Sequence, residues 1–378
     1  MNFQPYPFER LKNLIAPITP KKEGLTLTIG EPQFPTPATI QDALKSHTDE
    51  LRYYPKSIGE DYLKNAQIGF VQSRFGIKLA PNELLPTFGT REVLFNFPQF
   101  LLFDTPNPTI AHPNPFYQIY EGAAKASRAK SIYMHLEKSN DFKPTLSLEQ
   151  RKQVDLVILN SPNNPTGATL TLEELQIWVR WALEYDFVLL NDECYSDIYQ
   201  TTPPHSILEA SYGIGNQDFK NILALNSISK RSSAPGLRSG FIAGDSKILK
   251  SYQQYRTYLG CAIPNPIQRA SATAWEDRIE SENIRKKYAA NLKIAQEIFP
   301  DTPIAPYTFY LWLFVGKDIE FTQKLYEQEG ILVLPGSFLG RDGGGEGYVR
   351  IALVYEESVL KEALKCIASF LNSYLKGK

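Results

Sequence analysis

The stretch of sequence that decides the fold is LVILNSPNNPTGATLTLEELQIWVRWALEYDFVLLNDECY, residues 156–195. It begins with a short apolar run at 156–159, continues into a helix-length amphipathic stretch at 172–184, and reaches a second apolar run at 187–190. A third apolar run follows at 222–225. Strand-length runs that alternate with helix-length amphipathic stretches predict a mainly parallel sheet with helices on both faces. The sequence therefore predicts an α/β fold.

Polar clusters follow three of these apolar runs directly, at residues 160–167, 192–195 and 227–230. The carboxyl ends of parallel strands meet at one edge of a sheet, and ligands bind there. We therefore expect the three clusters to be loops that lie together at this edge.

The two ends of the chain predict a second, smaller domain. The Pro-rich stretch through Pro37 shows no strand–helix alternation, whereas the chain after about residue 276 begins with a long charged helix. A Gly-rich loop at 336–347 precedes an expected strand at 348–354, and a final amphipathic helix starts near Glu356. We divide the chain into an N-terminal segment that packs with the small domain, a large domain and a small C-terminal domain, at 1–40, 41–275 and 276–378.

Composition excludes several classes of function. The 40 Lys and Arg residues balance 41 Asp and Glu residues, and a net charge of -1 argues against nucleic acid as a main partner. No secretory signal or long uncharged apolar stretch is evident, so we expect no membrane span. The three cysteines are far apart, which fits no disulfide framework and favours the cytoplasm. The four histidines lack ligand spacing, so we expect no metal.

Lys230 is the candidate reactive residue. It comes just after an apolar run, among the hydroxyls of Ser227 and Ser229, with Arg231 and Arg238 close behind. A lysine amine can form an imine with an aldehyde and then carry a proton, while hydroxyls and a guanidinium suit a phosphate. An isolated Ser-Lys-Arg would be better interpreted as a basic surface turn, and only the wider pattern favours a reactive lysine.

Four motifs carry that wider pattern: SPNNPTG at 161–167, DECY at 192–195, SISK at 227–230 and PGLRSG at 235–240. In their order and spacing the chain resembles the fold-type I, class I/II pyridoxal-phosphate aminotransferases over nearly its whole length. The resemblance implies a large domain with a mainly parallel seven-stranded sheet between helices, and a smaller α/β domain built from both termini. It also implies pyridoxal 5'-phosphate as cofactor, amino acids and 2-oxo acids as substrates, and a homodimer.

By resemblance, Lys230 forms the imine with the cofactor and later carries the proton, and Asp192 pairs with the protonated pyridine nitrogen. A carboxylate there keeps the nitrogen cationic, so that the ring can accept electrons. Asn164 and Tyr195 resemble the two donors to the ring's phenolate oxygen. A helix N-cap is the alternative for Asp192, and a plain Asn-Pro turn is the alternative for Asn164.

A phosphate site is implied at the start of a helix expected at 91–97. Backbone N–H groups at a helix start favour an anion, although Gly-Thr before a helix is by itself an ordinary cap. The resemblance assigns the phosphate to residues from three segments: Gly89, Thr90, Arg91, Ser227, Ser229 and Arg238.

Two aromatic assignments stay open by one residue each. Tyr117 matches the aromatic residue that stacks on the cofactor ring in the family, with Phe116 as a rival and core packing as the alternative for both. Tyr54, five positions before Gly59, corresponds to the tyrosine that reaches the phosphate of the neighbouring subunit. Tyr53 is its rival, and a simple surface aromatic is the alternative for either.

Substrate binding is assigned to Arg350, Asn164 and Gly30. Arg350 stands where the family has the arginine that binds the substrate α-carboxylate, and an arginine among apolar strand residues needs an anionic partner. An internal salt bridge is the alternative. Gly30 lies in the segment that closes over substrate in the family, where a side chain would obstruct the backbone; an ordinary turn glycine is the alternative.

Longer phrases resemble bacterial N-succinyldiaminopimelate aminotransferases of lysine and cell-wall precursor synthesis; they lie at 89–95, 114–123, 229–245 and 255–262. The implied reaction moves the amino group of glutamate to N-succinyl-2-amino-6-oxopimelate. Arg91, Arg231 or Arg256 would then meet the distal carboxylates.

Three other interpretations remain. An aspartate or an aromatic, broad-specificity aminotransferase, or a carbon–sulfur lyase of the same fold, would share the cofactor residues. A non-catalytic regulatory protein with the same fold would lack one of the chemical residues, and none is missing. A nucleotide-phosphate loop at 343–347 is disfavoured because these glycines do not lie between a strand and a helix.

Overall fold

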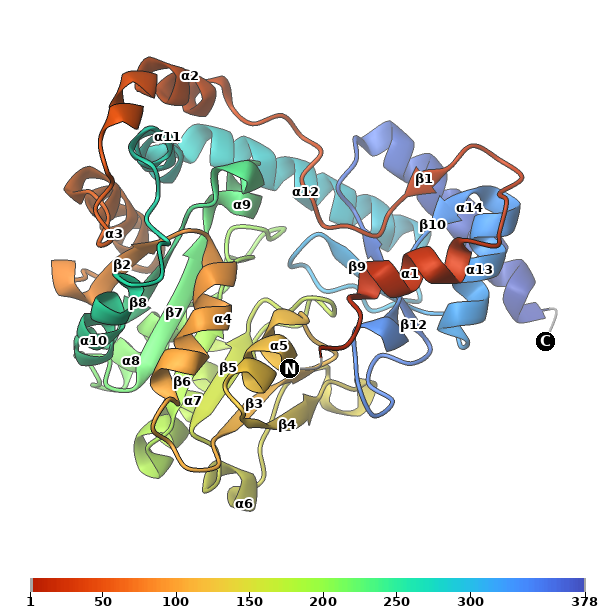
Figure 1. Cartoon of the computed structure of the whole chain (residues 1–378). Helices are drawn as coiled ribbons and strands as arrows, with labels where there is room; N and C mark the ends of the chain where they lie inside the picture. Colours follow the sequence, from red (N-terminus) through yellow and green to blue (C-terminus); the bar gives the residue numbers. More distant parts are fainter. Residues whose placement is uncertain (1–2, 377–378) are drawn as a thin grey trace.

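A seven-stranded sheet forms the centre of the computed structural model, which describes residues 3–376 (Figure 1). The strand order is β2-β8-β7-β6-β5-β3-β4, and only β8 runs antiparallel to its neighbours. The strands in that order are β2 (Leu84–Thr87), β8 (Gly240–Gly244), β7 (Ile222–Ser227), β6 (Val188–Asp192), β5 (Leu156–Asn160), β3 (Thr109–Asn114) and β4 (Lys130–His135). The predicted α/β fold with a mainly parallel central sheet is confirmed.

The two faces of the sheet are covered by different helices, because successive strand residues point to opposite sides. In β5, Val157 and Leu159 join one apolar core, while Leu156 and Ile158 join another. The first core is closed by α3 (Asp61–Phe75), α7 (Leu172–Tyr185), α8 (Ile207–Gly213) and α11 (Asn265–Glu276), and packs against α2 (Ala38–Ser46). The second is closed by α4 (Thr90–Leu101), α5 (Ile119–Ala126) and α10 (Ser246–Arg256). The fully apolar run at 156–159 is thus explained by burial on both faces.

A second part of the molecule is built around a three-stranded antiparallel sheet in the order β11-β12-β9. Its strands are β9 (Tyr310–Phe314), β11 (Leu334–Pro335) and β12 (Tyr348–Ala352), and its helices are α12 (Arg278–Ile298), α13 (Asp318–Glu329) and α14 (Glu357–Lys376). Leu27 packs in this core beside Leu311 and Val349. The division at 1–40, 41–275 and 276–378 stays a prediction, and its outermost residues, 1–2 and 377–378, lie outside the described residues.

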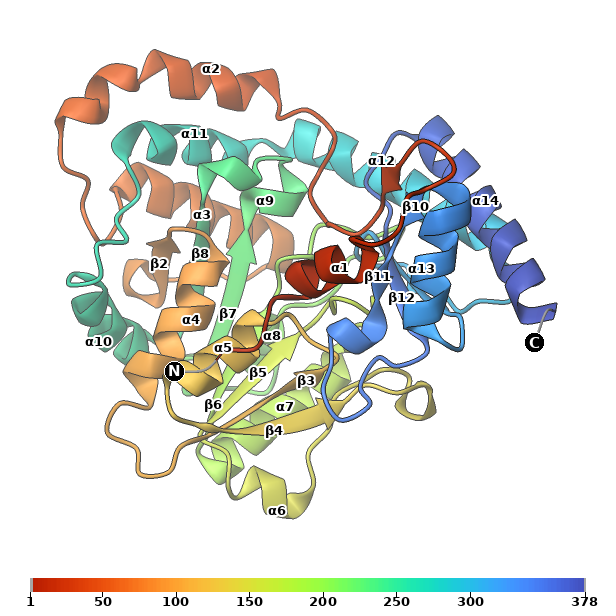
Figure 2. The ribbon, with the colours of Figure 1, turned by 45° about the vertical axis from the view of Figure 1, so that its right-hand side comes forward.

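The N-terminal segment lies between the two parts of the molecule (Figure 2). Strand β1 (Leu25–Thr26) pairs in parallel with β10 (Ile331–Leu332), and helix α1 (Pro7–Ile15) packs Leu11 against Trp312. This position brings the chain around Gly30 to the carboxyl edge of the large sheet.

The Gly-rich loop packs against β3 and α5 of the large sheet region. Asn114 accepts a hydrogen bond from Arg341 N at 2.9 Å and donates to Arg341 O at 2.7 Å. A Cβ on Gly344 would lie 2.4 Å from Asn114 Oδ1, which explains why glycine stands there. The Arg341 guanidinium also contacts both carboxylate oxygens of Glu121, at 2.9 and 2.7 Å.

The predicted elements near the site differ in length from the observed ones. The helix expected at 91–97 is the longer α4, and the strand expected at 348–354 ends at Ala352. All three cysteines are free thiols. Within residues 3–376 no helix is both long enough and apolar enough to cross a bilayer. The cytoplasmic location stays a prediction.

Candidate active site

Three loops meet at the carboxyl edge of the large sheet, as the sequence predicts. Strands β5, β6 and β7 end at Asn160, Asp192 and Ser227, and β7 runs directly into the short helix α9 (Ile228–Arg231). A pocket of about 410 Å³ lies at this edge. Its lining includes most of the site residues that the sequence indicates: Gly30, Thr90, Arg91, Tyr117, Asn164, Asp192, Tyr195, Ser227, Ser229, Lys230, Arg238 and Arg350.

Lys230 projects into this pocket from the first turn after β7. Ser227 starts the turn, because its hydroxyl accepts a hydrogen bond from Ser229 N at 3.1 Å. The Lys230 amine donates to the carbonyl of Gly30, which comes from the N-terminal segment. Burial is the main cause that lowers the pKa of Lys230 to about 8; the nearby charge of Arg350 acts in the same direction, and Cys194 opposes it. Lys230 therefore has the reactivity of a neutral amine closer to physiological pH than an ordinary lysine.

We expect Lys230 in the cofactor-free chain to react with an amine-specific reagent with a midpoint near pH 8, well below the ordinary lysine value of 10.5. Mass spectrometry of the peptide that contains Lys230 measures the modified fraction at each pH. In the variant Arg350→Gln the midpoint of the Lys230 reaction should be higher than in the wild type, because the substitution removes a positive neighbour of the amine. A wild-type midpoint near 10.5 would contradict the expectation.

Asp192 is buried at the end of β6. Its carboxylate accepts hydrogen bonds from the Tyr120 hydroxyl at 2.9 Å and from Cys194 N at 3.2 Å. Within residues 3–376 it is the only carboxylate in the pocket lining. Burial raises the pKa of Asp192, while the bonds from Cys194 and Tyr120 lower it. A buried carboxylate in this state favours a cationic partner, such as a protonated ring nitrogen.

Tyr195 and Asn164 lie on the side of the pocket that faces the small domain. The Tyr195 hydroxyl is 3.2 Å from the Tyr310 hydroxyl. Burial and the neighbouring Tyr310 raise the pKa of Tyr195 well above its usual value, so its phenol stays protonated and can donate. Asn164 N donates to Asn160 Oδ1 at 2.8 Å, which fixes the turn. Its side-chain oxygen accepts from Arg350 Nη1 at 2.8 Å.

Hydroxyls and a guanidinium converge at the start of α4. Thr90 begins the helix after Gly89, whose φ is 73°. Arg238 Nη1 donates to Pro235 O at 2.8 Å, and within residues 3–376 no carboxylate pairs with Arg238. Burial and the charge of Arg91 lower the pKa of Arg238, so an anion between these two cations would be favoured. A phosphate fits this set of donors.

Gly89 is outside the pocket lining, but it leaves room for Arg238. A Cβ at residue 89 would lie 2.3 Å from Arg238 Nη2, at a backbone conformation that other residues rarely adopt. We expect Gly89→Ala to weaken binding of pyridoxal 5'-phosphate about tenfold or more, because the guanidinium must move away from the helix start. Fluorescence titration of the cofactor-free chain measures the Kd. Gly76→Ala is the control: Gly76 has a φ of 71° but open space around its Cβ, so affinity should not change.

Phe116 and Tyr117 both line the pocket. The Phe116 ring is almost parallel to that of Tyr133, with centroids 6.1 Å apart, while the Tyr117 hydroxyl accepts from Arg91 Nε at 2.7 Å. The choice of the ring that stacks on the cofactor stays a prediction.

Tyr54 and Tyr53 lie away from the pocket of their own chain. Tyr54 is 100% exposed and Tyr53 is 55% exposed, on the chain between η1 (Thr48–Arg52) and α3. The expected contact of one of these tyrosines with the cofactor phosphate of a neighbouring subunit stays a prediction.

Two of the arginines proposed for distal carboxylates are wrong assignments. The guanidinium of Arg256 is buried in an ion pair with Glu92, at 2.6 Å from Nε to Oε1, and that of Arg231 pairs with Asp197 at 2.7 Å. Both side chains are therefore held outside the pocket by internal carboxylates. Arg91 lines the pocket and, among the described residues, pairs with no carboxylate.

The sequence did not identify two residues of the site, Tyr120 and Tyr310. Tyr120 contacts Asp192 from α5, and Tyr310 contacts Tyr195 from β9. Both are buried, and in the sequence a buried tyrosine has the same pattern as an ordinary core residue. The position of Tyr120 three residues after Tyr117 on a short helix was the only available signal.

A reactive lysine, a buried carboxylate and a phosphate-binding helix start define an enzyme of the pyridoxal 5'-phosphate-dependent class, because these are the groups that meet an aldehyde, a ring nitrogen and a phosphate. The family model "Aminotransferase class I and II" matches residues 22–367. The chain belongs to this family, whose members use pyridoxal 5'-phosphate and act on amino and oxo acids.

Three similar proteins support the family assignment. The structure of aminotransferase AspB from Helicobacter pylori is 58% identical, with a TM-score of 0.98, and the match covers 98% of this chain and 100% of that one. The 4-dedimethylamino-4-oxo-anhydrotetracycline transaminase OxyQ of Streptomyces rimosus is 33% identical, over 87% of this chain and 89% of OxyQ. The LL-diaminopimelate aminotransferase of Syntrophobacter fumaroxidans is 30% identical, over 96% of this chain and 95% of its own length.

Proposed function

We propose that this enzyme converts N-succinyl-2-amino-6-oxopimelate and L-glutamate into N-succinyl-LL-2,6-diaminopimelate and 2-oxoglutarate. The observation that carries the proposal is the charge of the pocket, where four cationic side chains meet the single carboxylate of Asp192. With Arg238 assigned to the cofactor phosphate and Arg350 to an α-carboxylate, Arg91 borders the phosphate and would also meet a further anionic group of the substrate. Glutamate and N-succinyl-LL-2,6-diaminopimelate, the two amino acids of this reaction, both carry a carboxylate besides the one at the reacting carbon. Similarity to an LL-diaminopimelate aminotransferase agrees with a substrate of this shape.

We assign the cofactor contacts to residues that line the pocket or bound it. Pyridoxal 5'-phosphate supplies an aldehyde that captures the amino group and a ring that accepts electrons from the α-carbon. Asp192 would hold the ring nitrogen, and Asn164 and Tyr195 would donate to the ring oxygen. The phosphate would be held by six residues: Gly89, Thr90, Arg91, Ser227, Ser229 and Arg238.

Lys230 would act first as the point of cofactor attachment and then as an acid–base group. With an amino donor bound, the free amine of Lys230 would take the proton from the substrate α-carbon and deliver it to the cofactor carbon. A pKa of about 8 suits both the acceptance and the release of this proton. Arg350 would hold the α-carboxylate, which fixes the α-carbon beside Lys230. The second substrate reverses these steps, so ping-pong kinetics are expected.

We also propose that the active unit is a homodimer. Tyr54 is fully exposed and Leu51 is 70% exposed, which leaves an apolar surface near residues 51–54 for a second copy. In that arrangement the Tyr54 hydroxyl would complete the phosphate site of the other subunit.

The substrate pair is tested by the two half-reactions. The visible absorption of the purified enzyme with pyridoxal 5'-phosphate is recorded, and then glutamate alone and succinyl-diaminopimelate alone are added to separate samples. Conversion of the cofactor to its amino form by both compounds supports the proposal. Conversion by aspartate or aromatic amino acids, without succinyl-diaminopimelate, would identify a different aminotransferase; no conversion by any amino acid would indicate a non-catalytic protein.

Arg91→Met should separate donors with one and two carboxylates. We expect kcat/KM for glutamate and succinyl-diaminopimelate to fall about tenfold or more, because one charge-assisted hydrogen bond is lost. The value for alanine should change much less. Since Arg91 is also proposed to contact the phosphate, cofactor Kd is measured in parallel; an equal loss for all donors would contradict the distal-carboxylate role.

A further inference from the structure

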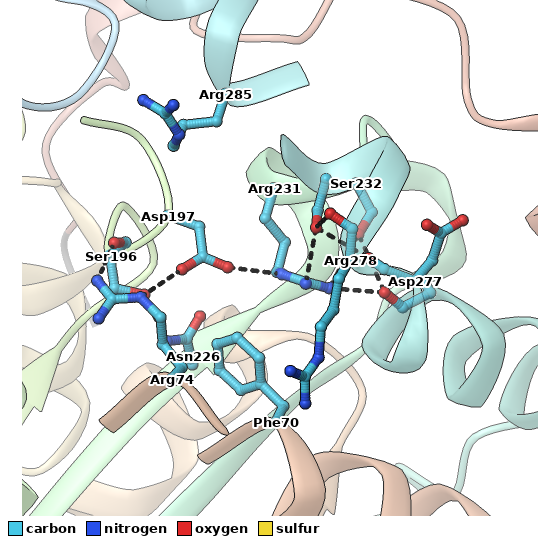
Figure 3. Close-up of polar contacts among 12 residues, drawn as sticks. Phe70, Arg74, Ser196, Asp197, Asn226, Arg231, Ser232, Asp277, Arg278 and Arg285 are labelled. Atoms are coloured by element: carbon cyan, nitrogen blue, oxygen red, sulfur yellow. Dashed lines mark hydrogen bonds and ion pairs between the residues drawn. The ribbon is translucent and has the colours of Figure 1, made fainter. Parts of the chain in front are cut away.

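Asp197 lies between Arg74 and Arg231 (Figure 3), and none of these three residues lines the pocket of Lys230. Its Oδ1 accepts from Arg74 Nε at 2.9 Å, and its Oδ2 accepts from Arg231 Nε at 2.7 Å. The exposed fractions of the side chains are only 15% for Arg74, 14% for Asp197 and 4% for Arg231. Because Arg74 belongs to α3 and Arg231 to α9, the carboxylate joins elements that are far apart in the sequence.

Other donors of Arg231 reach the end of α11 and the start of α12. Its Nη1 donates to Ala274 O at 2.6 Å, near the end of α11, and its Nη2 donates to Ser281 Oγ at 3.2 Å, in the first turn of α12. The guanidinium also lies over the rings of Phe70 and Trp275, at 4.9 and 5.4 Å. Hydrogen bonds and ring contacts from several elements therefore hold the Arg231 guanidinium in place.

Both members of the Asp197–Arg231 pair are neighbours of pocket residues without lining the pocket themselves. Arg231 directly follows Lys230. Asp197 comes two residues after Tyr195, in a tight turn where Ile198 N donates to Tyr195 O at 3.0 Å. The pair therefore connects the segment that carries Lys230 with the segment that carries Asp192 and Tyr195.

Helix α12 continues this connection into the small domain. Asn291, in its second half, donates to Leu353 O at 3.0 Å and to Tyr355 O at 2.9 Å, just after β12. Strand β12 carries Arg350. A continuous series of contacts thus joins Lys230 to the strand that presents Arg350.

We propose that Asp197 and Arg231 are positioning residues for transamination. They hold Lys230 at a fixed place relative to Asp192 and Tyr195, and through Ser281 they fix the start of α12 against the lysine segment. Stability alone does not account for this arrangement, since buried ion pairs can often be replaced by apolar residues without loss of stability. The inference concerns the transamination step and is independent of which donor the enzyme prefers.

Asp197→Asn tests the proposal, because it keeps the shape and removes the charge. In the holoenzyme, with the best amino donor of the wild type, we expect kcat to fall about tenfold to a hundredfold while KM changes less than about threefold. The midpoint of the visible absorbance in a pH titration should also move downward, because two uncompensated arginines next to the lysine segment disfavour its protonated form. Thermal unfolding of the cofactor-free chain shows whether the variant is folded.

Glu282→Gln is the matched control. Glu282 pairs with Arg285 at 2.6 Å. It lines a small cavity of about 160 Å³ that Asp197 and Arg231 also line, but no hydrogen bond or ion pair joins it to Arg231. We expect kcat and the absorbance midpoint of this variant to be those of the wild type.

Ser281→Ala removes the bond between Arg231 and α12, together with the bonds that the Ser281 hydroxyl donates to the carbonyls of Asp277 and Arg278 at the start of that helix. It keeps the proposal testable if Asp197→Asn does not fold. We expect a smaller fall in kcat, about threefold to tenfold, in a chain that is folded as the wild type is. Wild-type kcat and an unchanged absorbance midpoint in Ser281→Ala, and in Asp197→Asn if it folds, would overturn the proposal and leave the pair a purely structural role.

Discussion

Replacement of Lys230 by alanine is expected to lower kcat by about ten-thousandfold or more while the chain stays folded. Among the described residues, the amine is the only lysine nitrogen in the pocket lining, and it donates to the carbonyl of Gly30. Without it, the substrate α-proton has no positioned acceptor of suitable pKa, and the cofactor has no covalent attachment. The neighbouring Tyr195 cannot take over, because burial raises its pKa well above the usual value.

Borohydride reduction gives a readout that is independent of turnover. Reduction of the wild-type holoenzyme should fix the mass of the cofactor on the peptide that contains Lys230, and the same treatment of Lys230→Ala should fix none. Lys64→Ala is a suitable control, since Lys64 is a buried lysine of α3 whose pKa is likewise lowered by burial, yet it lies outside the pocket. Cofactor fixed on the Lys230→Ala chain, or turnover within tenfold of the wild type, would refute the assignment.

The central sheet was predictable from sequence because burial on both faces leaves a direct pattern. The run at 156–159 is entirely apolar, and its neighbour at 187–190 has the same length and character, which only a strand covered on both sides requires. The polar residues that follow such runs must then meet at one edge. The topology of the sheet alone therefore predicts that Asp192, Asn164 and Lys230 lie close together, and all three line the pocket.

The contacts that orient these groups were not predictable in the same way. Arg231 and Arg256 looked equally available for a substrate carboxylate, but each is paired with an acidic residue distant in sequence, Asp197 or Glu92. Such pairings depend on how α3, α4, α9 and α10 pack, and no local periodicity reports that packing. The role of Tyr120 was not predictable for the same reason, because the contact of its hydroxyl with Asp192 depends on how α5 packs on the sheet.

Arg350 is the group whose loss should affect every amino acid substrate. It is 4% exposed in the centre strand of the small sheet, with Nη1 donating to Asn164 Oδ1 at 2.8 Å and Nη2 to Thr28 O at 2.6 Å. Its Nε is buried and has no hydrogen-bond partner, and among residues 3–376 no carboxylate pairs with it. A buried guanidinium with an unused donor is costly unless an anion binds it. The internal salt bridge considered for this residue is therefore absent from the described chain, and a substrate carboxylate is the partner that we expect.

Arg350→Gln should lower kcat/KM for amino acids by about a hundredfold to a thousandfold, mainly through KM, because one partner of a buried, hydrogen-bonded charge pair is removed. Arg350→Lys should rescue little, since an ammonium lacks the planar fork that matches a carboxylate. Arg341→Gln is the control. Because Arg341 already pairs with Glu121, its replacement should lower kcat/KM for amino acids far less than that of Arg350. The sharpest comparison uses an amine without the α-carboxylate, whose slow reaction Arg350→Gln should leave unchanged. An equal loss with that amine would mean that Arg350 acts on the shape of the pocket and not on the carboxylate.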